Sequence, residues 1–233
     1  MRRYLIVDDN RAFAENLSEI LRDQGDEVVV VGNGALALAA VKAQTFNAMI
    51  TDMRMPVMGG AQLVHEVRRV DPGLPAIVVT AYTQENDLSS ARQEGLLAVL
   101  PKPVPIHQLL VLLNAARRNG VVAVIENDVS MCDNLVEALR DRGFTAITAN
   151  SALEARRLGE IRPFAALVDL QLAGSSQGEV AQELSRKFMG LPLLVMTGFP
   201  ELRPSFEASE VYLKPFEIGE LLTRLEALHE GGR

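Results

Sequence analysis

The sequence predicts an α/β protein made of two similar domains, each with a parallel β-sheet that is covered by helices on both faces. The chain has 233 residues, which is enough for two compact domains. Several motifs recur after 112 to 118 residues. In each copy, short continuous apolar runs alternate with longer segments of helical period, as in parallel sheets that are buried on both faces.

Five apolar runs in the first copy predict its strands. The runs are rich in β-branched residues and lie at 4–7, 27–31, 47–51, 76–79 and 97–100. Between them, apolar residues recur with helical spacing, for example at Phe13, Leu17 and Leu21, and again at Leu63 and Val67. The alternation of five strands with helices predicts a (βα)5 domain.

The second copy repeats this order of elements. Its segment 122–128 resembles the segment 4–10, and Ser151 followed by Glu154 forms a capping box that predicts the start of its second helix. Towards the end of this copy, Pro200 and Pro204 leave little room for a full fourth helix. We therefore expect one domain at 1–118 and a second, with a shortened fourth helix, at 119–233.

Charge and cysteine usage exclude several classes of protein. The net charge is −7, and the basic doublets Arg68-Arg69, Arg117-Arg118 and Arg156-Arg157 are isolated, so we interpret them as solvated helix surface and expect no nucleic-acid binding. No apolar run reaches the roughly 18 to 20 residues of a membrane span, so we expect a cytoplasmic protein without a signal peptide or a membrane partner. The single cysteine, Cys132, excludes an intrachain disulfide.

Polar residues of the first copy fall at the carboxyl ends of its predicted strands. Asp8 and Asp9 follow the first strand, Asp52 the third, Thr80 the fourth and Lys102 the fifth. Ligands of open α/β sheets bind at this edge, where the strand order reverses. Asp is common in strand-terminal turns, but five such groups on one edge are unusual. The sequence therefore predicts a functional site there.

The residue types at this edge suit aspartyl phosphorylation. Three carboxylates in one pocket repel each other, and Mg²⁺ with its preference for oxygen ligands relieves that repulsion. One carboxylate can then act as a nucleophile, while a hydroxyl and an ammonium bind the phosphoryl oxygens.

Both copies resemble the receiver (CheY-like) domains of two-component response regulators. The motifs that carry the resemblance in the first copy are Val7-Asp8-Asp9-Asn10, Asp52-Met53-Arg54-Met55-Pro56 with Met58-Gly59-Gly60, Val79-Thr80-Ala81-Tyr82 and Pro101-Lys102-Pro103. The resemblance implies a flavodoxin-like, doubly wound fold with the strand order 2-1-3-4-5 in each domain. It covers nearly the whole chain.

The resemblance also implies a role for each residue of the first site. Asp52 would be the phosphoacceptor, and Asp9 and Asp52 would bind Mg²⁺ directly. Asp8 would act largely through water, and the main-chain carbonyl of Arg54 would complete the metal site. Thr80 and Lys102 would each bind a phosphoryl oxygen, and the peptide bond between Lys102 and Pro103 would be cis.

The second copy departs from this pattern in its acidic pair. It retains Asp169, Thr197 and Lys214, but Glu126 and Asn127 replace the two aspartates, which removes one metal-binding carboxylate. Asp128 could compensate for that loss. The resemblance also implies a switch aromatic three residues before the lysine; Val99 occupies that position in the first copy, and Tyr212 could act as the switch aromatic of the second copy if a loop residue has been lost. The sequence leaves open whether this copy is a poorly phosphorylated contact domain or a second acceptor.

The leading functional hypothesis is a tandem-receiver response regulator without an output domain. It would accept a phosphoryl group on Asp52 from a histidine kinase or a phosphotransfer protein and signal by contact with a downstream protein, with homodimerisation left open. It would not be an enzyme beyond its own phosphorylation and dephosphorylation. The alternatives are a non-phosphorylated interaction scaffold, a fragment of a hybrid histidine kinase and, more remotely, a haloacid-dehalogenase-like phosphatase, which expects Asp-x-Asp on its first strand.

Overall fold

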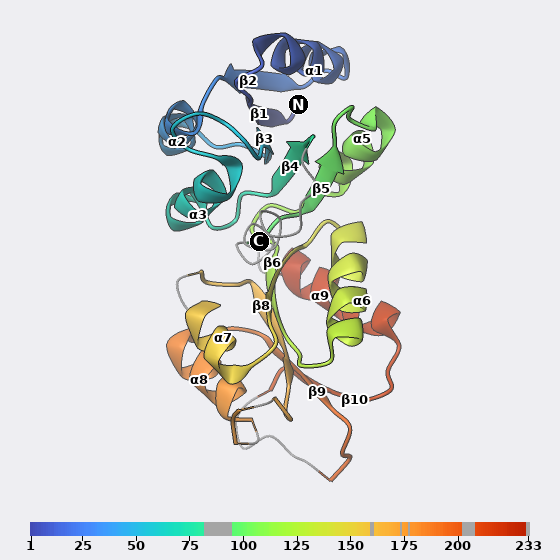
Figure 1. The fold of residues 1–233 in the computed structure, drawn as a ribbon. Helices are drawn as coiled ribbons and strands as arrows, with labels where there is room; N and C mark the ends of the chain where they lie inside the picture. Colours follow the sequence, from blue (N-terminus) through green and yellow to red (C-terminus); the bar gives the residue numbers. More distant parts are fainter. Residues whose placement is uncertain (82–94, 159–160, 173, 177, 202–207, 232–233) are drawn as a thin grey trace. The chain divides into compact units, whose positions relative to one another are not determined.

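A computed structural model describes residues 1–81, 95–158, 161–172, 174–176, 178–201 and 208–231. The chain divides into two compact units, Met1–Asn119 and Gly120–Arg233, and each unit contains one five-stranded sheet (Figure 1). The two units are α/β in architecture, as the sequence predicts.

The first sheet is entirely parallel and has the order β2-β1-β3-β4-β5. Its strands are β1 (Arg3–Val7), β2 (Glu27–Val31), β3 (Ala48–Asp52), β4 (Ala76–Thr80) and β5 (Ala98–Pro101). In the centre of the sheet, Ile6 pairs with Val30 on one side and with Ile50 on the other. This order is the predicted one, and its reversal point lies between β1 and β3.

Within the described residues of the first unit, two pairs of helices cover the faces of the sheet (Figure 1). On one face lie α1 (Arg11–Asp23) and α5 (Ile106–Ala115), and on the other lie α2 (Gly34–Ala43) and α3 (Gly60–Val70). Asn10 and Asn33 begin α1 and α2, because each side-chain oxygen accepts a hydrogen bond from the backbone N–H three residues later. The predicted fourth helix of this domain, with Tyr82, lies outside the described residues.

The second sheet repeats the first. Its strands are β6 (Val121–Ile125), β7 (Thr145–Ala149), β8 (Ala165–Asp169), β9 (Leu193–Thr197) and β10 (Glu210–Leu213). All of its pairs are parallel, and the order β7-β6-β8-β9-β10 matches that of the first sheet. The residues between β9 and β10 that bear on the shortened fourth helix, 202–207, lie outside the described part of the chain.

The helices of the second unit also cover both faces of their sheet. On one face lie α6 (Val129–Asp141) and α9 (Ile218–Gly231), and on the other lie α7 (Ala152–Arg157) and α8 (Glu179–Lys187). The capping box predicted at the start of α7 forms in part: Ser151 Oγ accepts from the Glu154 N–H, while the Glu154 carboxylate accepts from the N–H of Asn150. Among the described residues, no helix is long and apolar enough to cross a membrane.

The interpretation of the basic doublets as solvated surface is wrong for Arg68, although its neighbour Arg69 is exposed. Arg68 is buried, and its guanidinium donates hydrogen bonds to the main-chain carbonyls of Pro72, Leu74 and Gly95. Arg118 also bonds within its unit, donating to the carbonyl of Phe46 and to Asp71. These arginines donate hydrogen bonds to main-chain carbonyls at loop and strand ends. The sequence pattern around a basic doublet does not reveal such carbonyls.

Candidate functional site

The parallel sheet brings the predicted residues of the first unit to one edge. Asp8 follows the last residue of β1, Asp52 ends β3, Thr80 ends β4 and Lys102 follows β5. One carboxylate oxygen from each of Asp8, Asp9 and Asp52 lies within 4.8 Å of the others. The sequence therefore located these groups correctly, because strand ends in one sheet converge.

Lys102 lies between two of the three carboxylates. Its Nζ is 2.6 Å from Asp8 Oδ2 and 3.4 Å from Asp52 Oδ2. The other oxygen of each carboxylate accepts a backbone hydrogen bond, from the N–H of Asn10 to Asp8 and from the N–H of Met53 to Asp52, both at 2.8 Å. Both carboxylates are thus fixed by main chain on one side and face the ammonium on the other.

A backbone hydrogen bond joins the ends of β4 and β5 beside the Asp8 and Asp52 carboxylates. Thr80 is fully buried, and its carbonyl accepts a hydrogen bond of 2.9 Å from the Lys102 N–H. The Lys102–Pro103 peptide bond is cis, as predicted. Arg54, two residues after Asp52, has an exposed side chain.

The charges of the pocket favour a divalent cation. Burial raises the pKa of Asp52; Lys102 counteracts part of that rise, and the nearby Asp8 carboxylate adds to it. Asp8, Asp9 and Asp52 together exceed the single positive charge of Lys102 by two. The side-chain atoms that could bind a metal here are all carboxylate oxygens. Mg²⁺ prefers such oxygen ligands, whereas softer metals prefer nitrogen or sulfur. The residues present therefore fit this ion.

A pair of glycines lets the acceptor loop fold back closely on Asp52. The Gly60 N–H donates to the carbonyl of Met53 at 2.8 Å. A Cβ on Gly60 would lie 2.4 Å from the Asp52 carbonyl oxygen, and one on Gly59 would lie 3.0 Å from the Met53 carbonyl oxygen. The close approach explains why glycine occupies the first position of α3.

The site of the second unit contains two carboxylates instead of three. Lys214 Nζ lies 2.6 Å from Glu126 Oε2 and 3.0 Å from Asp169 Oδ2, so its ammonium contacts both acids. Backbone N–H groups of Asp128 and Gln171 bond the remaining oxygens of Glu126 and Asp169, respectively. The longer Glu126 side chain thus preserves the arrangement that Asp8 makes in the first unit.

The third acid that could have completed this site has another role. Asp128 caps α6, because its Oδ1 accepts from the Met131 N–H at 3.0 Å, as Asn10 does for α1. Asn127, an exposed amide, stands where the first unit has Asp9. The expected compensation by Asp128 therefore does not occur in this structure, and in the described part of the second unit no three acidic groups converge as they do in the first.

The pKa values of the second site reflect this pairing. Burial raises the pKa of Glu126, and the hydrogen bond from Lys214 only partly counteracts the rise. For Lys214, burial lowers the pKa, but the bonds to Glu126 and Asp169 outweigh burial and raise it overall. The lysine is thus held as a cation by the two acids.

The structure also shows the surroundings of Thr197 and Tyr212, the two other residues of the second unit that the sequence analysis singles out. Thr197 Oγ1 accepts a hydrogen bond from the Phe199 N–H at 3.1 Å, so the hydroxyl oxygen is engaged by its own loop. Tyr212 pairs with Met196, just as Leu100 pairs with Val79. Tyr212 therefore takes the place of Leu100 rather than that of Val99, the position expected for a switch aromatic.

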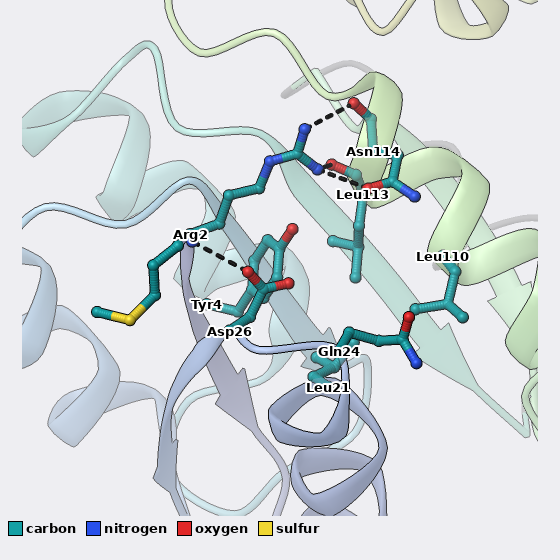
Figure 2. Close-up of a pocket in the computed structure, with 9 residues that line it drawn as sticks. Arg2, Tyr4, Leu21, Gln24, Asp26, Leu110, Leu113 and Asn114 are labelled. Carbon is teal, nitrogen blue, oxygen red and sulfur yellow. Dashed lines mark hydrogen bonds between the residues drawn. The ribbon is translucent and has the colours of Figure 1, made fainter.

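Sequence reasoning missed a cavity at the opposite end of the first sheet. Figure 2 shows this cavity, of about 240 Å³, between the start of β1, the turn before β2 and the end of α5. The Arg2 guanidinium donates to the Leu113 carbonyl and to Asn114, and the Arg2 N–H donates to Asp26. In the second unit, Phe144 takes the position of Asp26 and packs against Phe164 and His229.

Comparison with known proteins identifies relatives of both the first unit and the whole chain. Residues 4–114 match the model of the response regulator receiver domain family. The response regulator receiver protein Anae109_2439 of Anaeromyxobacter sp. (strain Fw109-5) is 56% identical over 229 residues, which is 98% of this chain and 96% of the relative. The probable transcriptional regulatory protein TcrX of Mycobacterium tuberculosis is 33% identical over 52% of each chain.

Solved structures include similar single domains. The receiver domain of the sensor histidine kinase PA1611 from Pseudomonas aeruginosa PAO1, with a magnesium ion coordinated in its active site cleft, is 28% identical with a TM-score of 0.46. It covers 48% of this chain and 94% of that one. Because the Anaeromyxobacter relative aligns with nearly the whole sequence at 56% identity, the chain belongs to the response regulator receiver family.

Proposed function

We propose that the chain is a tandem-receiver response regulator that is phosphorylated on Asp52 in a Mg²⁺-dependent phosphorelay. The observation that carries this proposal is the convergence of the Asp8, Asp9 and Asp52 carboxylates within 4.8 Å beside the Lys102 ammonium. A nucleophilic carboxylate, acidic metal ligands, a cation and a buried hydroxyl are the parts that phosphoryl transfer to a protein carboxylate needs.

Each residue of the first pocket has a proposed role. Asp8, Asp9, Asp52 and the main-chain carbonyl of Arg54 would hold the metal, with Asp8 acting largely through water. When bound, Mg²⁺ offsets the negative charge that the carboxylates and the phosphoryl group bring together. The Asp52 carboxylate oxygen forms a bond to phosphorus while the phosphorus–nitrogen bond of a donor phosphohistidine breaks and the imidazole leaves. Lys102 and the Thr80 hydroxyl then donate to phosphoryl oxygens.

The partners follow from this chemistry. The donor would be a histidine kinase or a phosphotransfer protein in the cytoplasm, and the output would be contact with a downstream protein or a second copy of the chain. We propose no nucleic-acid or membrane partner. One arginine of each basic doublet is engaged within its own unit: Arg68 is buried, Arg118 pairs with Asp71, and Arg156 pairs with Glu179 and Glu183.

The second unit is proposed to act by contact rather than as an efficient acceptor. It keeps Asp169, Thr197 and Lys214, but its lysine already contacts both carboxylates at 3.0 Å or less. With one carboxylate fewer, the pocket has less need of a divalent cation. A fragment of a hybrid histidine kinase is the alternative setting, in which the donor would belong to the same longer chain.

Incubation with phosphoramidate, a small phosphodonor, in the presence of Mg²⁺ tests the proposal. Intact mass is measured for the wild type, Asp52→Asn and the matched control Asp169→Asn. We expect one phosphoryl group on the wild type and on Asp169→Asn, and none on Asp52→Asn. Absence of any addition would favour the interaction scaffold, and sustained release of phosphate without accumulation would favour a haloacid-dehalogenase-like phosphatase.

A further inference from the structure

The Lys102 ammonium has a third neighbour besides its two carboxylates. Its Nζ lies 4.3 Å from the centroid of the Phe13 ring. Phe13 is partly buried in the first turn of α1 and also packs against the core cluster that includes Leu17 and Leu109. A cation at this distance over an aromatic face is attracted by the ring quadrupole.

Lys102 needs more than one restraint if its ammonium is to stay in place to bind a phosphoryl oxygen on Asp52. A lysine side chain is a flexible four-carbon stem with a compact charge at its end. Its contact with Asp8 is close, at 2.6 Å, but its contact with the acceptor Asp52 is longer, at 3.4 Å. The lysine side chain is also 20% exposed, so water competes for the ammonium. An additional contact that does not consume a carboxylate would keep the ammonium near Asp52.

We propose that Phe13 is a positioning residue for phosphoryl transfer, and that its ring holds the Lys102 ammonium beside Asp52. The ring carries no net charge, so it can restrain the lysine without competing with the metal ligands or the phosphoryl group for hydrogen bonds. This inference rests on the proposed phosphorylation of Asp52. It adds a residue from α1 to a pocket otherwise built from strand ends.

The second unit provides an internal comparison for this role. Phe13 and Met131 occupy the same position, because each backbone N–H bonds to the N-cap side chain three residues earlier, Asn10 and Asp128, respectively. Met131 has no ring. Lys214 in that unit is instead held by two close carboxylates, at 2.6 and 3.0 Å. The aromatic residue thus occurs in the unit whose lysine is less tightly held by its acceptor aspartate.

A double-mutant cycle tests whether Phe13 acts through Lys102. We expect Phe13→Leu to slow phosphorylation of Asp52 by phosphoramidate about 2- to 5-fold, and Phe13→Tyr, which retains the ring, to restore most of the rate. In a Lys102→Met background, Phe13→Leu should change the rate no further. The control Met131→Leu should leave it unchanged. An equal loss with and without Lys102, or a Phe13→Tyr rate as low as that of Phe13→Leu, would overturn the proposal.

A second measurement separates failure of this inference from failure of the proposed function. The chain has only four lysines, Lys42, Lys102, Lys187 and Lys214, so ¹³Cε-lysine labelling gives a simple spectrum. The ε-methylene protons of Lys102 should be shifted upfield by the Phe13 ring and return towards the position of Lys42 in Phe13→Leu. If Asp52 is never phosphorylated, the proposed function fails, and this shift still decides the contact. A Lys102 signal that is insensitive to Phe13→Leu would refute the positioning role.

Discussion

The two pockets share a lysine flanked by two carboxylates, yet they differ in how the charges are balanced. In the first, Lys102 is 2.6 Å from Asp8 but 3.4 Å from Asp52, and Asp9 adds a third acid. In the second, Lys214 contacts both of its acids closely, and Asn127 replaces the third. The second pocket thus has one carboxylate fewer than the first, and its lysine closely contacts both of the carboxylates that remain.

The units also differ at the amino ends of their strands. The first has the cavity of about 240 Å³ lined by Tyr4, Asp26 and Asn114 (Figure 2). In the second, the Phe144 ring stacks with Phe164 at 6.3 Å between centroids and meets His229 edge-on at 5.7 Å. The second unit, whose site has one carboxylate fewer, therefore has an aromatic cluster at the position where the first unit has a cavity.

The largest expected effect is on the stability of the second unit. Phe144 is fully buried, so Phe144→Ala should lower the free energy of unfolding of this unit by about 3 to 5 kcal/mol. Cys132 reports this unit selectively, since it is the single cysteine of the chain and is buried, with a pKa raised by burial to about 11. We expect much faster thiol labelling of the variant under native conditions.

Asp26→Ala is the matched control for that experiment, because Asp26 occupies the same position in the first unit. It accepts one hydrogen bond, from the Arg2 N–H, so its loss should cost about 1 kcal/mol and affect the first unit alone. Labelling of Cys132 should not change. Equal labelling rates in Phe144→Ala and the wild type would contradict the importance of the aromatic cluster.

The next effect concerns the third carboxylate. Asp9→Asn gives the first pocket the same number of carboxylates as the second, and we expect Mg²⁺-dependent phosphorylation of Asp52 to slow by on the order of 100-fold. The reciprocal change, Asn127→Asp, should give the second pocket measurable Mg²⁺-dependent labelling at Asp169. Rates are followed by intact mass over a Mg²⁺ titration. If Asp9→Asn is phosphorylated as fast as the wild type, the charge comparison does not explain the difference between the pockets.

A smaller effect is expected at the glycine behind the acceptor. Gly60→Ala would place a Cβ 2.4 Å from the Asp52 carbonyl oxygen, so the loop must shift, at a cost of about 1 to 3 kcal/mol to the first unit. Gly219 in α9 has open space around its Cβ position, and Gly219→Ala should be neutral or stabilising by up to about 1 kcal/mol. The hydrogen-exchange protection of peptides from each unit measures the stability changes in both variants. Equal protection in Gly60→Ala and the wild type would show that the close approach is not required.

The smallest effect is a pH dependence of the second unit. The pKa of Glu126 is raised above its ordinary value of 4.5, chiefly by burial. At pH values between the ordinary pKa and the raised pKa of Glu126, the folded state binds more protons than the unfolded state. The stability that this group contributes therefore falls as pH rises through the raised pKa. Glu126→Gln removes this contribution. We expect a flatter dependence of Cys132 protection on pH from 4.5 upwards, and an unchanged dependence would show that Glu126 does not titrate as described.

Much of the fold and of the first site could be predicted from the sequence. The site residues lie at the ends of strands, and the strands themselves are recognisable in the sequence. Continuous apolar runs locate the strands, and the parallel order then brings Asp8, Asp52, Thr80 and Lys102 to one edge. The repeat extends the same reasoning to Asp169 and Lys214. These residues are adjacent to elements whose positions the apolar pattern defines.

The features that the sequence did not reveal depend on side-chain contacts between distant segments. The carbonyl partners of Arg68 come from the turn after α3 and from Gly95, so its burial could not be distinguished from solvated helix surface. The contact of Phe13 with Lys102 joins α1 to the end of β5. The capping role of Asp128 could have been anticipated, because Asp is a preferred N-cap residue and Asn10 precedes the first helix in the same way.

The location of the phosphoryl group in the unmodified chain tests the proposed function most directly. The protein is reacted with phosphoramidate and Mg²⁺, aspartyl phosphate is trapped by borohydride reduction, and the reduced residue is located by peptide mass spectrometry. We predict reduction at Asp52, dependent on Mg²⁺, with little or none at Asp169. Reduction chiefly at Asp169, or at Asp52 to the same extent without Mg²⁺, would contradict the proposed function.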